Sequence, residues 1–393
     1  MIELLAPAGN RNKLNTAFHF GADAVYVGGT QLSLRAYADN FNNDSLREGV
    51  DFAHSLNKKV YVAVNIFPRN SDFGIINEFL QFLETIRADG VIVSDLGVLK
   101  AASRYKTPIH ISTQANTTNG YAARVYQDMG ASRLILAREV SIAEMGEIRN
   151  MVEMELEAFI HGAMCISYSG RCLLSNYLAA RDGNRGECVQ ACRWEYIIRE
   201  KGKAEELTVT EDDRGTYILN SKDLNMIGHL RQLKDAGVNS FKIEGRMKSE
   251  YYVANVVNAY RRAIDNNYTA TKELKEELIK SSHRRYTTGF YLDEKDREDI
   301  VSSKSAGGYQ FAAEVIGRKE GGIVVEQRNR FRKGDTLEVL SNNKYFKKQI
   351  LIDKMYDICG NIIDDAKIVQ QELYIPTDYK LNKLDILRMK IEG

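Results

Sequence analysis

The sequence lacks long hydrophobic runs. No stretch approaches the roughly 18 consecutive apolar residues that a membrane-spanning helix needs. The first residues, MIELLAPAGNRNK, do not show a basic segment followed by a long apolar one. The sequence therefore predicts neither a membrane span nor a signal peptide. We expect a cytoplasmic protein with no membrane partner.

An excess of one charge is also missing. The 54 lysines and arginines nearly cancel the 53 aspartates and glutamates, which leaves a net charge of +1. Composition thus gives no global signal for nucleic acid, although a local basic patch could still bind a polyanion. The chain contains neither H-E-x-x-H nor G-x-S-x-G, and its 6 histidines show no metal-ligand spacing. The common hydrolase motifs are therefore absent.

The 393 residues include only 4 prolines, and 44% are hydrophobic, so a sizeable core is expected. Short apolar runs alternate with segments of helical periodicity, which is typical of parallel strands buried on both faces. Eight such strands predict an α/β fold, a TIM-like (β/α)8 barrel. A doubly wound open sheet is the alternative, but no glycine-rich dinucleotide motif follows the first strand. The predicted strands are Glu3–Ala6, Ala24–Val27, Lys59–Val64, Gly90–Val93, Ile109–Thr113, Arg133–Leu136, Glu157–Ile160 and Ser240–Ile243.

The alternation breaks after the seventh strand, and this break suggests the domain organisation. We predict a barrel over residues 1–268 with a Cys-rich insertion at about 162–220, a helical connector over 269–305, and a small all-β barrel or sandwich over 306–393. The gap before the eighth strand is expected to hold a polar segment around Lys201–Arg214 and a helix from about Asp223 to Ala236. A polar helix is expected over Thr269–Ser282.

Polar residues follow many of the predicted strands, where the loops of a barrel form its active-site face. We expect them to ring one mouth of the barrel, although each could instead cap a helix or pair with a neighbour. These residues are Asn65, Asp95, Gln114, Asn116, Arg138, Glu139, His161, Glu244 and Arg246.

Four of the 5 cysteines share one short stretch with the spacing C-x6-C-x15-C-x3-C. In a reducing compartment such clustering favours metal binding or redox work over structural disulfides. An iron–sulfur cluster, a zinc ion and reactive thiols are all left open by the spacing. The four are Cys165, Cys172, Cys188 and Cys192; the isolated Cys359 is expected to be structural.

The same stretch is rich in arginine and aromatic residues. Arginine binds phosphate or carboxylate, and aromatic rings stack on bases, so the stretch indicates either such a site or an ordinary solvated loop. The basic runs HRRY and RNRFRK suggest a nucleic-acid arm by the same reasoning. The residues of the stretch are Arg171, Arg181, Arg185, Arg193, Tyr168, Tyr177, Trp194 and Tyr196.

The cysteine stretch, EAFIHGAMCISYSGRCLLSNYLAARDGNRGECVQACRWEY, resembles the signature of the collagenase-like peptidase family, also called peptidase family U32. The resemblance extends over nearly the whole chain. It includes LLAPAGN (Leu4–Asn10), VYVGG (Val25–Gly29), STQANTTN (Ser112–Asn119), LNSKDL (Leu219–Leu224), FKIEGRMKS (Phe241–Ser249) and TTGFY (Thr287–Tyr291).

The resemblance implies several properties. Some members of the family hydroxylate RNA and carry a [4Fe–4S] cluster on four cysteines. Length and the C-terminal domain make the chain similar to the tRNA hydroxylation branch, which converts wobble uridine to 5-hydroxyuridine with prephenate as cosubstrate. The expected cluster ligands are Cys165, Cys172, Cys188 and Cys192, with zinc as the alternative.

Under this hypothesis a small carboxylate or RNA phosphate binds the arginines, and Glu244 or His161 handles protons. A tRNA is the expected partner, and a paralogous or identical second chain is a further candidate partner. One alternative is a metal-dependent peptidase; another is a non-catalytic RNA-binding or assembly module with structural cysteines. The expected substrate-binding residues are Arg138, Arg246, Gln114, Asn116, Asp95, Asn65 and Arg185.

Overall fold

The computed structural model describes residues 2–30, 32–34, 39–165, 167–194, 211–212, 215–216, 221–292 and 307–391. Eight parallel strands close into a barrel, because the first strand pairs with the last and the last pairs with the seventh. The predicted TIM-like barrel is therefore confirmed. The strands are β1 (Glu3–Pro7), β2 (Ala24–Gly28), β3 (Lys59–Val64), β4 (Gly90–Val93), β5 (Ile109–Ile111), β6 (Arg133–Ile135), β7 (Glu155–Ala163) and β11 (Ser240–Ile243).

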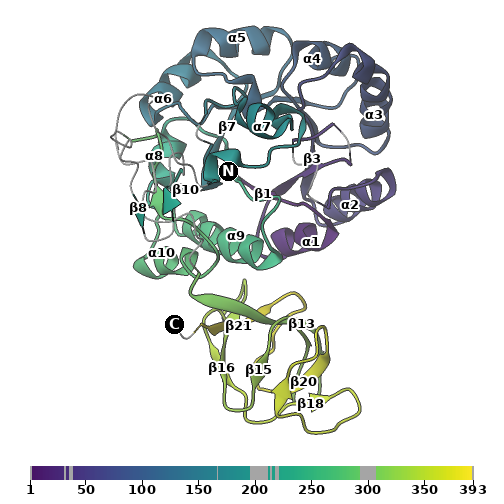
Figure 1. Ribbon diagram of the computed structural model, residues 1–393, viewed down its shortest axis with the longest axis vertical. Coiled ribbons are helices and arrows are strands. Elements are labelled where there is room, and N and C mark those ends of the chain that lie inside the picture. Colours follow the sequence, from purple (N-terminus) through teal and green to yellow (C-terminus); the bar gives the residue numbers. More distant parts are fainter. Residues whose placement is uncertain are drawn as a thin grey trace.

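Helices surround the barrel and cover its outer face (Figure 1). Several of them begin at a polar cap that the sequence supplies. Ser141 caps its helix in a reciprocal arrangement with Glu144, and Asn10 and Ser249 cap two others. The helices are α1 (Arg11–His19), α2 (Asn43–Ser55), α3 (Phe73–Thr85), α4 (Leu96–Ala102), α5 (Gly120–Asp128), α6 (Ile142–Met151), α8 (Leu230–Asp235) and α9 (Glu250–Asp265).

The helix predicted over Asp223–Ala236 is wrong in its first half. Residues Asp223–Asn225 form a strand, β10, which pairs antiparallel with β7, and helix α8 begins only at Leu230. The buried carboxylate of Asp223 accepts hydrogen bonds from Arg284, beside the short strand β12 (Tyr286–Thr287) that pairs with β10. This long-range ion pair holds the segment extended, which local periodicity does not reveal.

The polar helix predicted over Thr269–Ser282 is present as the shorter α10 (Lys272–Leu278). The polar segment predicted around 201–214 lies outside the described residues except for strand β8 (Glu211–Asp212), which pairs with β9 (Gly215–Thr216). Within the described ranges, each helix is too short or too polar to cross a lipid bilayer.

The C-terminal part is all-β, as predicted, and has its own apolar core. Short strands around residues 331, 356, 365 and 374 were not predicted, because three of them have only two residues and little periodicity. The described strands are β13 (Tyr309–Lys319), β14 (Gly322–Gln327), β15 (Phe331–Arg332), β16 (Thr336–Leu340), β17 (Gln349–Leu351), β18 (Tyr356–Asp357), β19 (Asp365–Ala366), β20 (Glu372–Pro376) and β21 (Ile386–Lys390).

Buried charges join the β-domain to the helices of the barrel. Arg388 on β21 is fully buried and forms ion pairs with Glu277 on α10 and with Glu338 on β16. Its guanidinium also donates to the side-chain oxygen of Asn255 on α9 at 2.9 Å. We call these four residues the interdomain cluster. Figure 1 shows the β-domain beside α9 and α10.

A second set of buried charges lies inside the barrel. Arg133 on β6 contacts Glu3 on β1 at 2.6 Å and Glu157 on β7 at 3.0 Å. Glu157 is fully buried and also pairs with Lys242 on β11 at 2.8 Å. Burial alone would raise the pKa of Glu3, but the Arg133 guanidinium holds it below its ordinary value. We call Glu3, Arg133, Glu157 and Lys242 the barrel network.

The barrel network predicts a large effect of removing its central cation. Arg133→Met should lower the free energy of unfolding by about 3–5 kcal/mol, because Glu3 and Glu157 would lose the charge that offsets their burial. Urea unfolding followed by circular dichroism measures the loss. Arg330→Met is the control, since Arg330 pairs with Asp365 at the surface. Equal unfolding midpoints for the two variants would contradict a stabilising role of the network.

Candidate functional site

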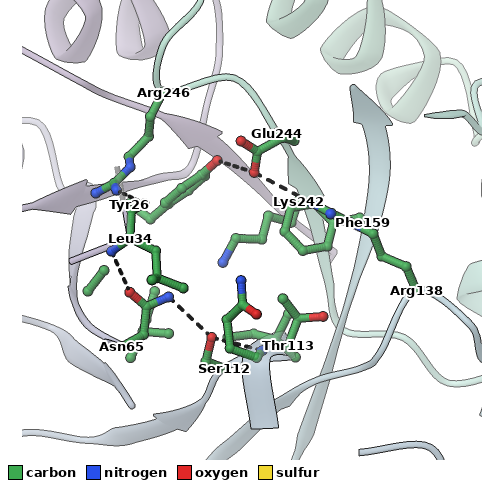
Figure 2. A pocket seen from close by; sticks show the side chains of 14 residues that line it. Tyr26, Leu34, Asn65, Ser112, Thr113, Arg138, Phe159, Lys242, Glu244 and Arg246 are labelled. Atoms are coloured by element: carbon green, nitrogen blue, oxygen red, sulfur yellow. Dashed lines mark hydrogen bonds and ion pairs between the residues drawn. The ribbon is translucent and has the colours of Figure 1, made fainter. Parts of the chain in front are cut away.

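A cavity of about 70 Å³ opens at the carboxyl ends of the barrel strands. This is the end at which the loops after the strands meet, and the side chains in Figure 2 converge on it from nearly every strand. The lining residues are Tyr26, Leu34, Ala63, Asn65, Ile92, Ser112, Thr113, Gln114, Ile135, Arg138, Phe159, Lys242, Glu244 and Arg246.

The structure brings together five of the residues that the strand-end pattern singled out: Asn65, Gln114, Arg138, Glu244 and Arg246. The side chain of Asn65 accepts a hydrogen bond from the Leu34 amide at 3.2 Å and donates to Ser112 at 3.3 Å. Gln114 carries a buried side-chain oxygen with no hydrogen-bond partner among the described residues. A donor on a bound molecule or water would satisfy this oxygen.

The charged groups at the pocket restrain one another. Arg138 lies 3.6 Å from the carboxylate of Glu244 and stacks over the ring of Phe159 at 4.1 Å. The hydroxyl of Tyr26 donates to the same Glu244 carboxylate at 3.4 Å (Figure 2). Arg246 is buried and donates to the carbonyl oxygen of Leu34 at 2.6 Å. These contacts fix the direction of each charge before any ligand binds.

Lys242 is a pocket residue that the sequence analysis missed. It lies in the middle of β11 (SFKI), which was interpreted only as an apolar run. Strict alternation along this strand places Lys242 on the opposite face from Phe241 and Ile243, and that signal could have identified it. Its ammonium group pairs with Glu157 and lies 4.4 Å from the ring centre of Tyr26. The pocket thus has three cationic side chains and one carboxylate, which suits a small anion.

Four other predicted residues lie outside the pocket lining. Asp95 caps α4, and Asn116 ends a short helical turn in the left-handed conformation. Glu139 accepts a hydrogen bond from the Ser169 amide at 3.0 Å. Arg185 binds Asp72 and the carbonyl oxygen of Phe67, each at 2.8 Å. These side chains position loops around the mouth, and a role of Asp95, Asn116 and Arg185 in substrate binding stays a prediction.

His161 also lies away from the pocket. It is buried in an aromatic cluster with Tyr252, Tyr260 and Tyr286, and its ring lies 3.2 Å from the Tyr260 hydroxyl. Burial lowers the pKa of His161 from 6.5 to about 3, so the ring is neutral near pH 7. His161 therefore makes no contact with the pocket that would support the proton-transfer role predicted for it.

The Cys-rich insertion covers the mouth of the barrel, as α7 (Leu174–Ala179) shows in Figure 1. The insertion is attached to loops that carry pocket residues. Ser169 contacts Glu139 after β6, and Gly170 lies so close to the Gln114 carbonyl that a Cβ there would clash with it. The Phe67 amide donates to the carbonyl oxygen of Asn184 at 2.9 Å. The insertion therefore packs against the loops that carry pocket residues, while the described residues that line the cavity all belong to the rest of the barrel.

Two of the four cysteines lie in direct contact. A hydrogen bond from Cys165, together with one from the Ser167 hydroxyl and the amides of Leu174 and Ser175, lowers the pKa of Cys172 to about 5. The same contact with Cys172 raises the pKa of the Cys165 thiol. Amide donors that favour a thiolate are what a metal-ligating cysteine needs.

The other two cysteines are nearby in the insertion. Cys188 lies next to the turn η3 (Gly183–Arg185), and Cys192 lies on the turn η4 (Ala191–Arg193), which packs against α7. In the described part of the chain, no three candidate ligands are gathered closely enough to hold a metal ion. The donor chemistry therefore fits a thiolate-bound cluster, but Cys188 and Cys192 would have to close onto the Cys165–Cys172 pair.

The neutral state of His161 predicts a pH dependence of stability. Below pH 6.5 the unfolded chain binds a proton at this position and the folded chain does not, so stability falls as the pH falls. Between pH 7 and pH 5 His161 should account for a loss of about 2 kcal/mol. The loss should be absent in His161→Gln, in which the side chain does not titrate. Urea unfolding of both proteins at the two pH values measures it, and parallel pH curves would contradict the assignment.

Comparisons with known proteins agree with this architecture. Residues 9–301 match peptidase family U32, and residues 308–388 match the peptidase family U32 C-terminal domain. The chain is 37% identical to tRNA hydroxylation protein P1 of Bacillus subtilis, over 98% of this chain and 94% of that protein. It is 39% identical to tRNA hydroxylation protein P of Escherichia coli, over 86% of each chain.

A third relative is the 23S rRNA 5-hydroxycytidine C2501 synthase of Escherichia coli, with 33% identity over 75% of this chain and 43% of that protein. Both parts of the family are matched in order, and together they cover the barrel and the β-domain. The chain therefore belongs to peptidase family U32.

Proposed function

We propose that this protein is a tRNA-modifying enzyme that hydroxylates wobble uridine to 5-hydroxyuridine. The observation that carries the proposal is the cationic pocket directly beneath the four-cysteine insertion. The relatives named for tRNA hydroxylation match nearly the full length of the chain, which supports the same assignment. A barrel mouth with redox-type ligands and no hydrolytic motif suits oxidation of a base better than hydrolysis.

In this proposal the pocket binds a small carboxylate cosubstrate, for which prephenate is our candidate. Arg138 and Lys242 present their cationic groups to the cavity, and Arg246 adds positive charge at its edge. A carboxylate would gain charge-assisted hydrogen bonds there without reorganising the site. Glu244 is the candidate for proton transfer, because its carboxylate lies at the pocket between Tyr26 and Arg138.

The four insertion cysteines are the proposed ligands of an iron–sulfur cluster. Such a cluster would supply electron-transfer chemistry beside the pocket. The contact between Cys165 and Cys172 and the lowered pKa of Cys172 support the donor set. A zinc ion on the same thiolates is the alternative.

The target base must leave its stack to reach the mouth, because the pocket lies below the rim of the barrel. The β-domain is the second proposed contact with tRNA. Its basic run is partly neutralised, since Arg328 pairs with Glu314 and Glu326, and Arg330 and Arg332 lie near Asp365. We therefore expect the barrel mouth to contribute more to binding than this run.

The proposal predicts the loss of one nucleoside. Deleting the gene should remove 5-hydroxyuridine and its derivatives from tRNA, and the wild-type gene should restore them. Arg138→Ala should restore less than about a tenth, because the pocket loses a cation that would bind the carboxylate. Mass spectrometry of digested tRNA measures the nucleosides, and Lys272→Met, which removes an exposed cation from α10, is the control for expression. Unchanged 5-hydroxyuridine in the deletion strain, with no paralogous gene present, would overturn the proposal.

The cluster proposal predicts iron and sulfide in the purified protein. After anaerobic purification the wild type should contain both and should absorb visible light. Cys172→Ala should lose most of both, since it removes one of the four proposed thiolate ligands. Cys359→Ala is the matched control, because this exposed cysteine lies in the β-domain. A colourless wild type with stoichiometric zinc would contradict the iron–sulfur assignment.

Peptidase activity is the second candidate function, and the description of the matched family favours it. It requires that the purified protein cleave gelatin and that a pocket substitution abolish the cleavage. Cleavage together with unchanged tRNA nucleosides in the deletion strain would replace the hydroxylase proposal. If the cysteine variants unfold, and none of them loses an activity while staying folded, the insertion has only a structural role.

A further inference from the structure

Three aromatic side chains of the insertion are exposed beside the barrel mouth. Tyr177 on α7 is 89% exposed, Tyr168 is 61% exposed, and Trp194 after η4 is 43% exposed. Large aromatic rings contribute most when they are buried, so a group of them in water indicates a surface that binds a partner. The proposed function, which rests on the pocket and the four cysteines, assigns no role to these three rings.

The three rings belong to one small substructure. Tyr168 lies in the turn that Ser169 fixes to Glu139, at the rim of the pocket. Tyr177 lies on α7, and α7 packs against η4, which ends directly before Trp194. Figure 1 shows α7 inside the ring of outer helices, across the end of the barrel. The three rings thus lie on segments at the end of the barrel through which a base would have to pass.

The part of the insertion that carries the rings has a local excess of positive charge, although the whole insertion over 162–220 has eight basic and nine acidic residues. Residues 162–194 contain four arginines and no lysine against one aspartate and one glutamate. Arg171 is exposed and follows Tyr168 in the same turn, where its amide donates to the Tyr168 carbonyl oxygen at 2.9 Å. Exposed rings combined with a local excess of arginine are typical of surfaces that bind single-stranded nucleic acid.

We propose that Tyr168, Tyr177 and Trp194 form a stacking platform for unpaired bases of the RNA. This inference rests on the proposed function and extends it to the class of RNA that binds. Bases in a duplex are stacked on each other and do not present their faces, whereas the bases of an open loop do. The platform therefore selects an unpaired loop and holds its bases next to the pocket.

Trp194 provides a direct measurement, because it is the only tryptophan of the chain. A hairpin RNA with a seven-nucleotide uridine-rich loop should quench its fluorescence in a saturable way. A fully paired duplex of the same length and charge should bind at least about ten-fold more weakly, since it offers no base for stacking. The titration uses the full-length protein and does not depend on turnover.

Substitutions of Tyr177 separate stacking from general apolar contact. Tyr177→Ala and Tyr177→Leu should each weaken hairpin binding by about ten-fold, and Tyr177→Phe should bind like the wild type. Ile358→Ala removes an exposed apolar side chain from the β-domain and should leave binding unchanged. Because Tyr177 is so exposed, the variants should unfold at the wild-type temperature, which a thermal melt checks.

The possible results divide clearly. Equal affinities for hairpin and duplex, or for Tyr177→Leu and Tyr177→Phe, would show binding by charge alone and would overturn the platform. If the deletion strain loses 5-hydroxyuridine but Tyr177→Ala restores it fully and binds normally, the platform fails and the proposed function stands. If the deletion strain keeps 5-hydroxyuridine, the proposed function itself fails.

Discussion

The ion pair between Glu157 and Lys242 is the interaction on which the candidate site depends. The interior of a TIM barrel is ordinarily filled by layers of branched apolar side chains. Here a fully buried glutamate lies between two buried cations, Arg133 below and Lys242 toward the pocket. Each charge is tolerated in the interior because the next one offsets its burial. The cationic floor of the pocket is therefore held from beneath by the core of the barrel.

The barrel was predictable from sequence because its strands are short apolar runs that end at polar residues. The position of His161 was not. The pairing of β7 with β11 shifts between Lys242 and Ile243, where Ile243 lies opposite His161 instead of Ile160. After such a bulge, the side chains that would have faced the barrel interior point to the other side. The local sequence pattern does not predict the bulge. His161 therefore joins the tyrosine cluster, while Glu244 and Arg246 reach the pocket as expected.

Other differences between the predicted and the observed structure also arise from contacts between distant parts of the chain. The pairing of Asp223 with Arg284 keeps β10 extended and joins residues that lie far apart in the chain. Lys242 was overlooked because the strand SFKI was interpreted as an apolar run, although Ser240 and Lys242 share its inward face. The four cysteines were predicted as ligands from their spacing, and that role stays a prediction. The contact between Cys165 and Cys172 depends on how the insertion folds, and spacing alone could not give it.

The interdomain cluster has a consequence for any ligand that touches both parts of the protein. Arg388 is fully buried between Glu277, Glu338 and Asn255, so the β-domain cannot swing on α9 and α10 without exposing or unpairing a charge. The distance between the barrel mouth and the β-domain is therefore fixed. A nucleic acid that engages both must present its two points of contact at the separation that the protein sets, and length becomes a criterion of recognition alongside sequence.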